Sequence, residues 1–152
     1  RHPRVVPLMI ATGLAEGAGL GIVAQLLLDP AALPGWAALL LVGLVLMRAL
    51  AFVTYLRGLG PAEAPTKARE ALAKFGRRLI GLDAVAIIAA ALGSIEPRYA
   101  WAVGLAGLVA ALAGGWFKFT LVTRAAYNQG LALRVTPVRG AGATRPGARP
   151  GW

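Results

Sequence analysis

The sequence has no cysteine, a single histidine and few acidic residues. Without cysteine, the chain has no disulfide, no thiolate metal site and no cysteine ligand for an iron–sulfur cluster of its own. The one histidine is His2, so two histidines of this chain cannot ligate a haem. Six Asp and Glu residues stand against 16 Lys and Arg residues, which gives a formal net charge of +10. The chain is therefore strongly basic and poor in metal-ligating side chains.

Hydrophobic residues make up 58% of the 152 residues, and the mean hydropathy is +0.68. Only 14% of the residues are charged, a composition too apolar for an ordinary soluble domain or a disordered chain. A nucleic-acid-binding protein would spread its positive charge over a polar face, whereas here the charge lies between long apolar runs. The composition predicts an integral membrane protein that binds no nucleic acid.

Four apolar segments are long enough, or nearly long enough, to cross a bilayer as helices. None shows the sustained alternation of a barrel strand, so we expect an all-α fold. The segments cover residues 5–28, about 31–56, about 79–95 and about 99–122, and the third could extend into the preceding segment. We predict a four-helix transmembrane bundle within residues 1–130, followed by an irregular Gly- and Pro-rich tail at 131–152.

The positive charges predict the orientation of this bundle. Residues 57–78 hold six Lys or Arg residues, and the N-terminal edge and the C-terminal tail hold seven more. Only Arg98 lies in a connection on the opposite side. Because cytoplasmic loops are enriched in Lys and Arg, we expect both termini and the middle connection to be cytoplasmic.

The middle connection itself carries a helical pattern. Ala68, Leu72, Phe75 and Leu79 fall on one stripe, and the charged residues lie elsewhere. This pattern predicts a basic interfacial helix that leads into the third span. Such a helix could anchor the chain on anionic lipid, and it could instead dock a soluble subunit.

Small residues recur at intervals of four in two of the spans. They are Gly13, Gly17 and Gly21 in the first span, and Gly107, Ala111 and Gly115 in the fourth. In lipid, such stripes allow helix backbones to approach closely. We expect them to serve packing and not catalysis.

Four ionisable residues lie inside the spans: Glu16, Arg48, Asp83 and Lys118. At 1.5 Å per residue, Glu16 lies about 16 Å from the inner boundary, and Arg48, Lys118 and Asp83 lie about 12, 8 and 6 Å from it. An unpaired charge at the bilayer centre costs at least about 2.5–3.5 kcal/mol, so these residues are functional candidates. Arg48, Asp83 and Lys118 could alternatively reach the interface or form structural ion pairs. Glu16 is too deep and too short for that, which favours a role in proton handling or ligand contact.

Two stretches resemble a known family: LMIATGLAEGAG at residues 8–19 and GGWFKFTLVTRAAYNQG at residues 114–130. They are similar to membrane-anchor subunits of molybdopterin oxidoreductases, in the dimethyl sulfoxide reductase and polysulfide reductase anchor family. The anchor associated with phenylacetyl-CoA:acceptor oxidoreductase is the most similar type. The resemblance covers most of the chain. Members usually have eight helices, so we expect this chain to correspond to the C-terminal half.

The resemblance implies a multi-pass subunit of the cell inner membrane that holds no haem. It implies binding of a quinone (menaquinone or ubiquinone) and two partners, an iron–sulfur electron-transfer subunit and a molybdopterin catalytic subunit. We expect a quinone head group near Glu16, Arg48, Asp83 and Lys118, where the bases or a protonated carboxyl would hydrogen-bond its carbonyl oxygens. Partner docking is expected at Arg124, Tyr127, Asn128 and Gln129. The chain would then be a non-catalytic or quinone-reactive part of the complex.

Two other functions stay open at this point. The chain could be a purely structural membrane anchor, with the quinone bound elsewhere in the complex. It could also be a small proton-coupled exporter, because a membrane-embedded Glu in the first of four helices resembles the small multidrug-resistance transporters. Their compact connections differ from the long basic connection and the tail of this chain.

Overall fold

The computed structural model describes residues 3–29, 33–59 and 66–126, and over these ranges its regular elements are all helical. This confirms the all-α expectation. The elements are α1 (Val5–Leu28), α2 (Ala37–Gly58), α3 (Thr66–Gly93), a 3-10 turn η2 (Pro97–Tyr99), α4 (Ala100–Thr120) and a π-helical segment η3 (Leu121–Ala126). The division at residue 130 and the irregular tail at 131–152 lie outside the described residues.

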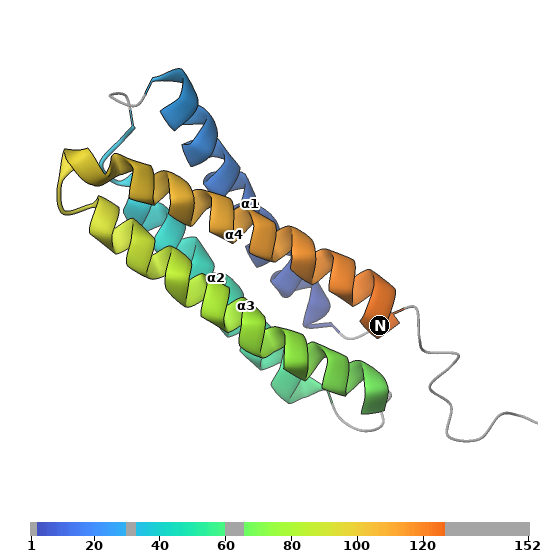
Figure 1. The fold of residues 1–152 in the computed structure, drawn as a ribbon. Helices are drawn as coiled ribbons and strands as arrows, with labels where there is room; N and C mark the ends of the chain where they lie inside the picture. Colours follow the sequence, from blue (N-terminus) through green and yellow to red (C-terminus); the bar gives the residue numbers. More distant parts are fainter. Residues whose placement is uncertain (1–2, 30–32, 60–65, 127–152) are drawn as a thin grey trace, which may run out of the picture.

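The four long helices run antiparallel to one another in chain order (Figure 1). α1 packs against α2 and α4, and α3 packs against the same two helices. Each helix therefore has two main neighbours, as in an up-and-down bundle with short connections. Arg4, just before α1, donates from Nη1 to the Thr54 carbonyl oxygen near the end of α2, at 3.0 Å.

Three of the helical segments are long and apolar enough to cross a membrane: Val5–Leu28, Ala37–Gly58 and Ala100–Arg124. The 22 residues of α2, for example, correspond to about 33 Å, which matches the hydrocarbon core of a bilayer. The chain is thus a multi-pass membrane protein. α3 is less apolar, because its final 18 residues include Arg77, Arg78 and Asp83.

The expected interfacial helix is not a separate element. α3 is one helix of 28 residues that joins the basic segment to the third apolar segment. The predicted stripe of Ala68, Leu72, Phe75 and Leu79 exists, and all four side chains are buried. The stripe packs into the bundle instead of lying on a lipid surface, since Leu72, Phe75 and Leu79 share a core cluster with residues of α1, α2 and α4. This internal packing explains why the helix runs on without a break.

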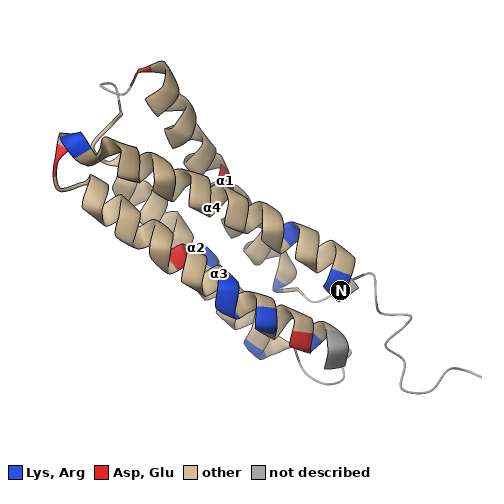
Figure 2. Cartoon of the chain, viewed as in Figure 1, with Lys and Arg blue, Asp and Glu red and all other residues tan. Residues whose placement is uncertain are grey.

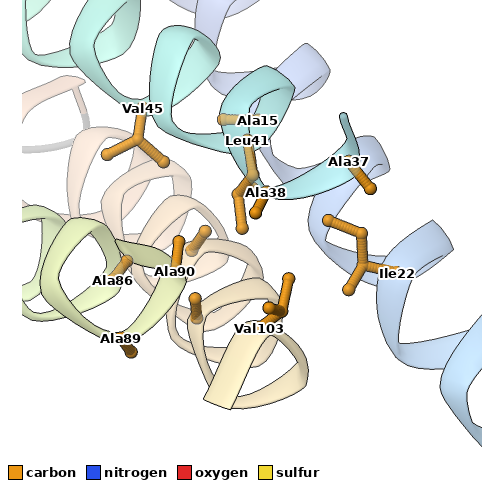
Figure 3. Packing of buried hydrophobic residues seen from close by; sticks show 12 residues of the cluster. Ala15, Ile22, Ala37, Ala38, Leu41, Val45, Ala86, Ala89, Ala90 and Val103 are labelled. Carbon is orange, nitrogen blue, oxygen red and sulfur yellow. The ribbon is translucent and has the colours of Figure 1, made fainter. Parts of the chain in front are cut away.

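Small side chains fill the larger core cluster (Figure 3). Eight of its twelve buried members are alanines, contributed by all four helices. Large apolar residues face outward instead, and examples are Leu39, Leu50, Ile88 and Leu112. Small residues inside and large ones outside are typical of helices that pack closely in lipid.

The closest backbone contact joins α1 to α4 at Gly19 and Gly107. A Cβ atom on Gly107 would come within 2.6 Å of the Gly19 carbonyl oxygen, and a Cβ on Gly19 would overlap the Gly107 carbonyl in the same way. The prediction that Gly107 serves packing is therefore confirmed. The predicted stripe of Gly13, Gly17 and Gly21 does not pack within this bundle, because a Cβ at any of these positions meets no atom within 4 Å. The face of α1 that makes the contact with α4 carries Gly19 instead.

Charge is divided unequally between the two ends of the bundle (Figure 2). At the end where α2 and α4 finish and α3 begins, the described basic residues include Arg4, Arg57, Arg69, Lys74, Arg77, Arg78 and Arg124. We call this the basic end. At the opposite end the described part of the chain carries Asp29, Glu96 and Arg98, and Arg98 pairs with Glu96.

Candidate functional site

The structure joins the four ionisable residues of the spans into two ion pairs. Glu16 of α1 pairs with Lys118 of α4, and Arg48 of α2 pairs with Asp83 of α3. Of the alternatives given for Arg48, Asp83 and Lys118, the structure shows ion pairing. Within residues 3–29, 33–59 and 66–126, no hydrogen bond or ion pair joins one pair to the other.

The pair of Arg48 and Asp83 is fully enclosed. The Arg48 side chain has no exposed surface, and 3% of the Asp83 side chain is exposed. Arg48 donates from Nη2 to Asp83 Oδ1 and from Nη1 to the Ala110 carbonyl oxygen of α4, the latter at 2.7 Å. Arg48 thus ties three helices together, although its Nε and Asp83 Oδ2 have no hydrogen-bond partner. Such a pair depends on both members, because removing one leaves a buried charge uncompensated.

The pair of Glu16 and Lys118 is only partly enclosed. The Lys118 side chain is 41% exposed at the bundle surface, whereas the Glu16 side chain is 16% exposed. Lys118 Nζ donates to Glu16 Oε2, and the other carboxylate oxygen, Oε1, is buried without a hydrogen-bond partner. A buried acceptor without a partner is uncommon and marks a place where a donor or a proton can be accommodated. The partly exposed Lys118 side chain and the buried Oε1 atom of Glu16 thus form one polar site at the edge of the bundle.

Gly114 makes room for this pair. A Cβ atom at position 114 would overlap the Glu16 carboxylate, with Cγ at 2.6 Å and Cδ at 2.8 Å. Gly114 precedes Lys118 by one helical turn, so both lie on the same face of α4. Reasoning from the sequence did not assign Gly114 to the site. The signal that could have found it is the i,i+4 spacing of a glycine and a lysine inside an apolar span.

Aromatic side chains of α2, α3 and α4 form a layer beside the ion pairs. Phe52 and Phe117 meet edge to face with ring centroids 5.6 Å apart, and Phe75 lies 5.9 Å from Phe117. Phe75 also meets Trp116, at 5.4 Å. Gly76 lets Phe52 reach this layer, because a Cβ there would overlap the Phe52 ring. The layer fixes α2, α3 and α4 against one another. It lies next to the partly enclosed pair of Glu16 and Lys118, which we call the half-open pair.

Three cavities lie elsewhere on the described part of the chain. One of about 360 Å³ is lined by residues of α2 and α3, including Leu56 and Arg69, and one of about 260 Å³ is lined by residues that include Gln25 and Trp36. A third, of about 150 Å³, lies between α3 and α4 at the basic end. None of these three is lined by Glu16, Arg48, Asp83 or Lys118. Of the two side chains of the partly enclosed pair, that of Lys118 is the more exposed.

Of the predicted docking residues, only Arg124 lies in the described part of the chain. It is exposed, in the π-helical segment η3 at the basic end. Tyr127, Asn128 and Gln129 lie outside the described residues. Across the described ranges, no group of three His, Cys, Asp or Glu residues could hold a metal ion.

Comparison of the chain with protein-family models, with curated proteins and with solved structures gave no match.

Proposed function

We propose that the chain is a quinone-interacting membrane-anchor subunit, which couples the quinone pool to an iron–sulfur and molybdopterin oxidoreductase. In this proposal α3 crosses the membrane together with α1, α2 and α4. Both termini and the basic end lie on the cytoplasmic side of the inner membrane. The observation that supports it most is the position of the half-open pair. Glu16 belongs to one of the two stretches that resemble the anchor family, and Gly114 and Lys118 belong to the other. The fold brings these distant stretches into one polar site.

Quinone reduction and quinol oxidation require two kinds of group in the protein. A quinone takes up two electrons and two protons to become a quinol, so its site must supply a hydrogen-bond donor and a proton carrier. The ammonium group of Lys118, whose side chain is partly exposed, is the donor, and it holds a carbonyl oxygen that approaches from the lipid side. The Glu16 carboxyl group behind it exchanges protons with that oxygen through the pair. Electrons pass to or from the cluster of the iron–sulfur partner.

The second pair takes a different part in this proposal. Arg48 and Asp83 were expected to share the quinone site, but their burial favours the alternative role of a structural ion pair. They hold α2 and α3 against Ala110 of α4, one turn from Gly114 and two turns from Lys118. The pair thereby positions the helix that carries the half-open site.

Docking of the redox partner is proposed at the basic end. Arg124 lies in η3, which directly follows the helix that carries Lys118. Tyr127, Asn128 and Gln129 come next in the sequence. A partner bound there would meet α4 directly. Purification of the chain from its native membrane tests this class of function: companion redox subunits are expected, whereas a small homo-oligomer with substrate-dependent proton flux would favour the exporter.

The direct test is substitution of Glu16→Gln in the intact complex. The amide keeps the size of the side chain but cannot carry the proton, so quinone-coupled turnover should fall by about a hundredfold or more, the usual contribution of a general acid or base. Glu96→Gln is the matched control, because Glu96 lies in a surface pair at the opposite end. Unchanged turnover in Glu16→Gln would remove Glu16 from the mechanism and leave the structural anchor as the better explanation.

A further inference from the structure

The cavity of about 150 Å³ at the basic end has a composition unlike that of the other two. Basic and aromatic side chains dominate its lining, and no acidic residue contributes to it. The residues that matter for its chemistry are Lys74, Arg78, Trp116, Phe119, Thr120 and Arg124. From this lining we propose that the cavity is a binding site for the headgroup phosphate of an anionic phospholipid.

The first argument is the placement of the cations. Lys74 and Arg78 are one helical turn apart, so they project from the same face of α3 toward the cavity. Both are exposed, and across the described ranges no ion pair joins either of them to an acidic side chain. Arg124 lines the cavity from the other side, on η3. Cations from two chain segments thus converge on one small space, which suits a phosphate better than a flat basic surface would.

The second argument is the aromatic wall. The Arg78 guanidinium carbon lies 5.8 Å from the centre of the Trp116 ring, within the range of a cation–π contact. This contact holds the guanidinium at the cavity. Indole rings are enriched at the depth of lipid headgroups, where one side of the ring is apolar and the other polar.

The third argument is the exit from the cavity. Phe119 is 65% exposed and Trp116 is 45% exposed, so the cavity opens between apolar side chains on the outer surface of the bundle. An acyl chain can follow that surface toward the membrane interior while its phosphate stays among the cations. Basic pockets between transmembrane helices are established as sites for anionic headgroups. A membrane lipid fits this exit better than a water-soluble anion does.

The test uses the full chain in nanodiscs made of equal amounts of phosphatidylglycerol and phosphatidylcholine. After transfer to detergent, native mass spectrometry counts the lipids that each protein molecule retains. Wild type is expected to retain phosphatidylglycerol in preference to phosphatidylcholine. In the double variant Lys74→Gln/Arg78→Gln, the ratio of retained phosphatidylglycerol to phosphatidylcholine should be about thirtyfold lower. This is the effect of two basic side chains on one anionic headgroup.

The matched control is Arg57→Gln/Arg77→Gln, which removes the same charge from the same end but outside the cavity. It should keep the preference. Equal losses in the two double variants would mean a diffuse charge effect and would overturn the site, as would a wild type without any preference. The last measurement adds inorganic phosphate to lipid-free protein. Phosphate binding that is lost only in Lys74→Gln/Arg78→Gln, together with a wild type that shows no preference for phosphatidylglycerol, would assign the cavity to a free anion instead.

A second measurement leaves Lys74 and Arg78 in place. Phosphatidylglycerol and phosphatidylcholine with brominated acyl chains quench nearby tryptophan fluorescence on contact. The Trp116 contribution, taken as the difference from Trp116→Phe, should be quenched more strongly by the brominated phosphatidylglycerol. Equal quenching by the two lipids would contradict a selective site at this cavity.

Discussion

The two ion pairs of the bundle have the same chemistry in opposite surroundings. Arg48 and Asp83 are enclosed by three helices, and the arginine has a further acceptor at the Ala110 carbonyl. Glu16 and Lys118 have one side at the bundle surface and one buried oxygen without a partner. An enclosed, multiply bonded pair is suited to holding helices together, whereas a half-open pair can exchange a partner or a proton. The exposure of each pair at the bundle surface is therefore a better guide to its role than its depth in the membrane.

The largest effect is expected from breaking the enclosed pair. Asp83→Ala leaves the Arg48 guanidinium buried without its carboxylate, and such changes cost about 3–5 kcal/mol. We expect a sharp loss of thermal stability in detergent and of accumulated protein in the membrane. Arg48→Met/Asp83→Leu removes both charges together and should recover most of that loss. A single variant as stable as wild type would show that the pair does not hold the bundle.

A smaller effect on stability, with a large effect on function, is expected at Gly114. In Gly114→Ala the new methyl group displaces the Glu16 carboxylate, which is the end of a flexible side chain and can turn away. The change in unfolding free energy should stay below about 1 kcal/mol, because alanine also favours the helix by a similar amount. Quinone-coupled turnover should nevertheless fall, as it does in Glu16→Gln.

Gly115→Ala is the control for this prediction, since a Cβ at that position meets no atom within 4 Å. Its turnover and its melting temperature should both equal or exceed those of wild type. Turnover that falls equally in the two alanine variants would mean that the effect comes from α4 as a whole and not from the Glu16 carboxylate.

Reasoning from the sequence alone predicted those features of the fold that follow from local amino-acid composition. Residues 5–28 were predicted as a span and form α1. Ion pairing was one alternative for Arg48, Asp83 and Lys118, because lone charges are costly in lipid. The partners themselves could not be derived, since pairing depends on which helices are neighbours. Arg48 could have met Glu16 as easily as Asp83 in a different arrangement of the same helices.

The sequence also could not predict which face each helix turns toward its neighbours. A stripe of glycines at 13, 17 and 21 and a lone glycine at 19 both permit close packing, and only the fold places Gly19 against Gly107. Whether the third apolar segment extends into the preceding basic segment was left open for a related reason. The stripe that ends at Leu79 suits an interfacial surface or a protein core equally well, and the core cluster at the basic end decided between them.

The difference in role between the two pairs can be measured directly as quinone binding by the full chain in nanodiscs. The matched variants are Arg48→Met/Asp83→Leu and Glu16→Leu/Lys118→Met, each of which removes one acid and one base. We expect a short-chain quinone analogue to bind the first variant with an affinity close to that of wild type and to lose its binding to the second. Retained binding in Glu16→Leu/Lys118→Met would contradict the assignment of the half-open pair as the quinone site.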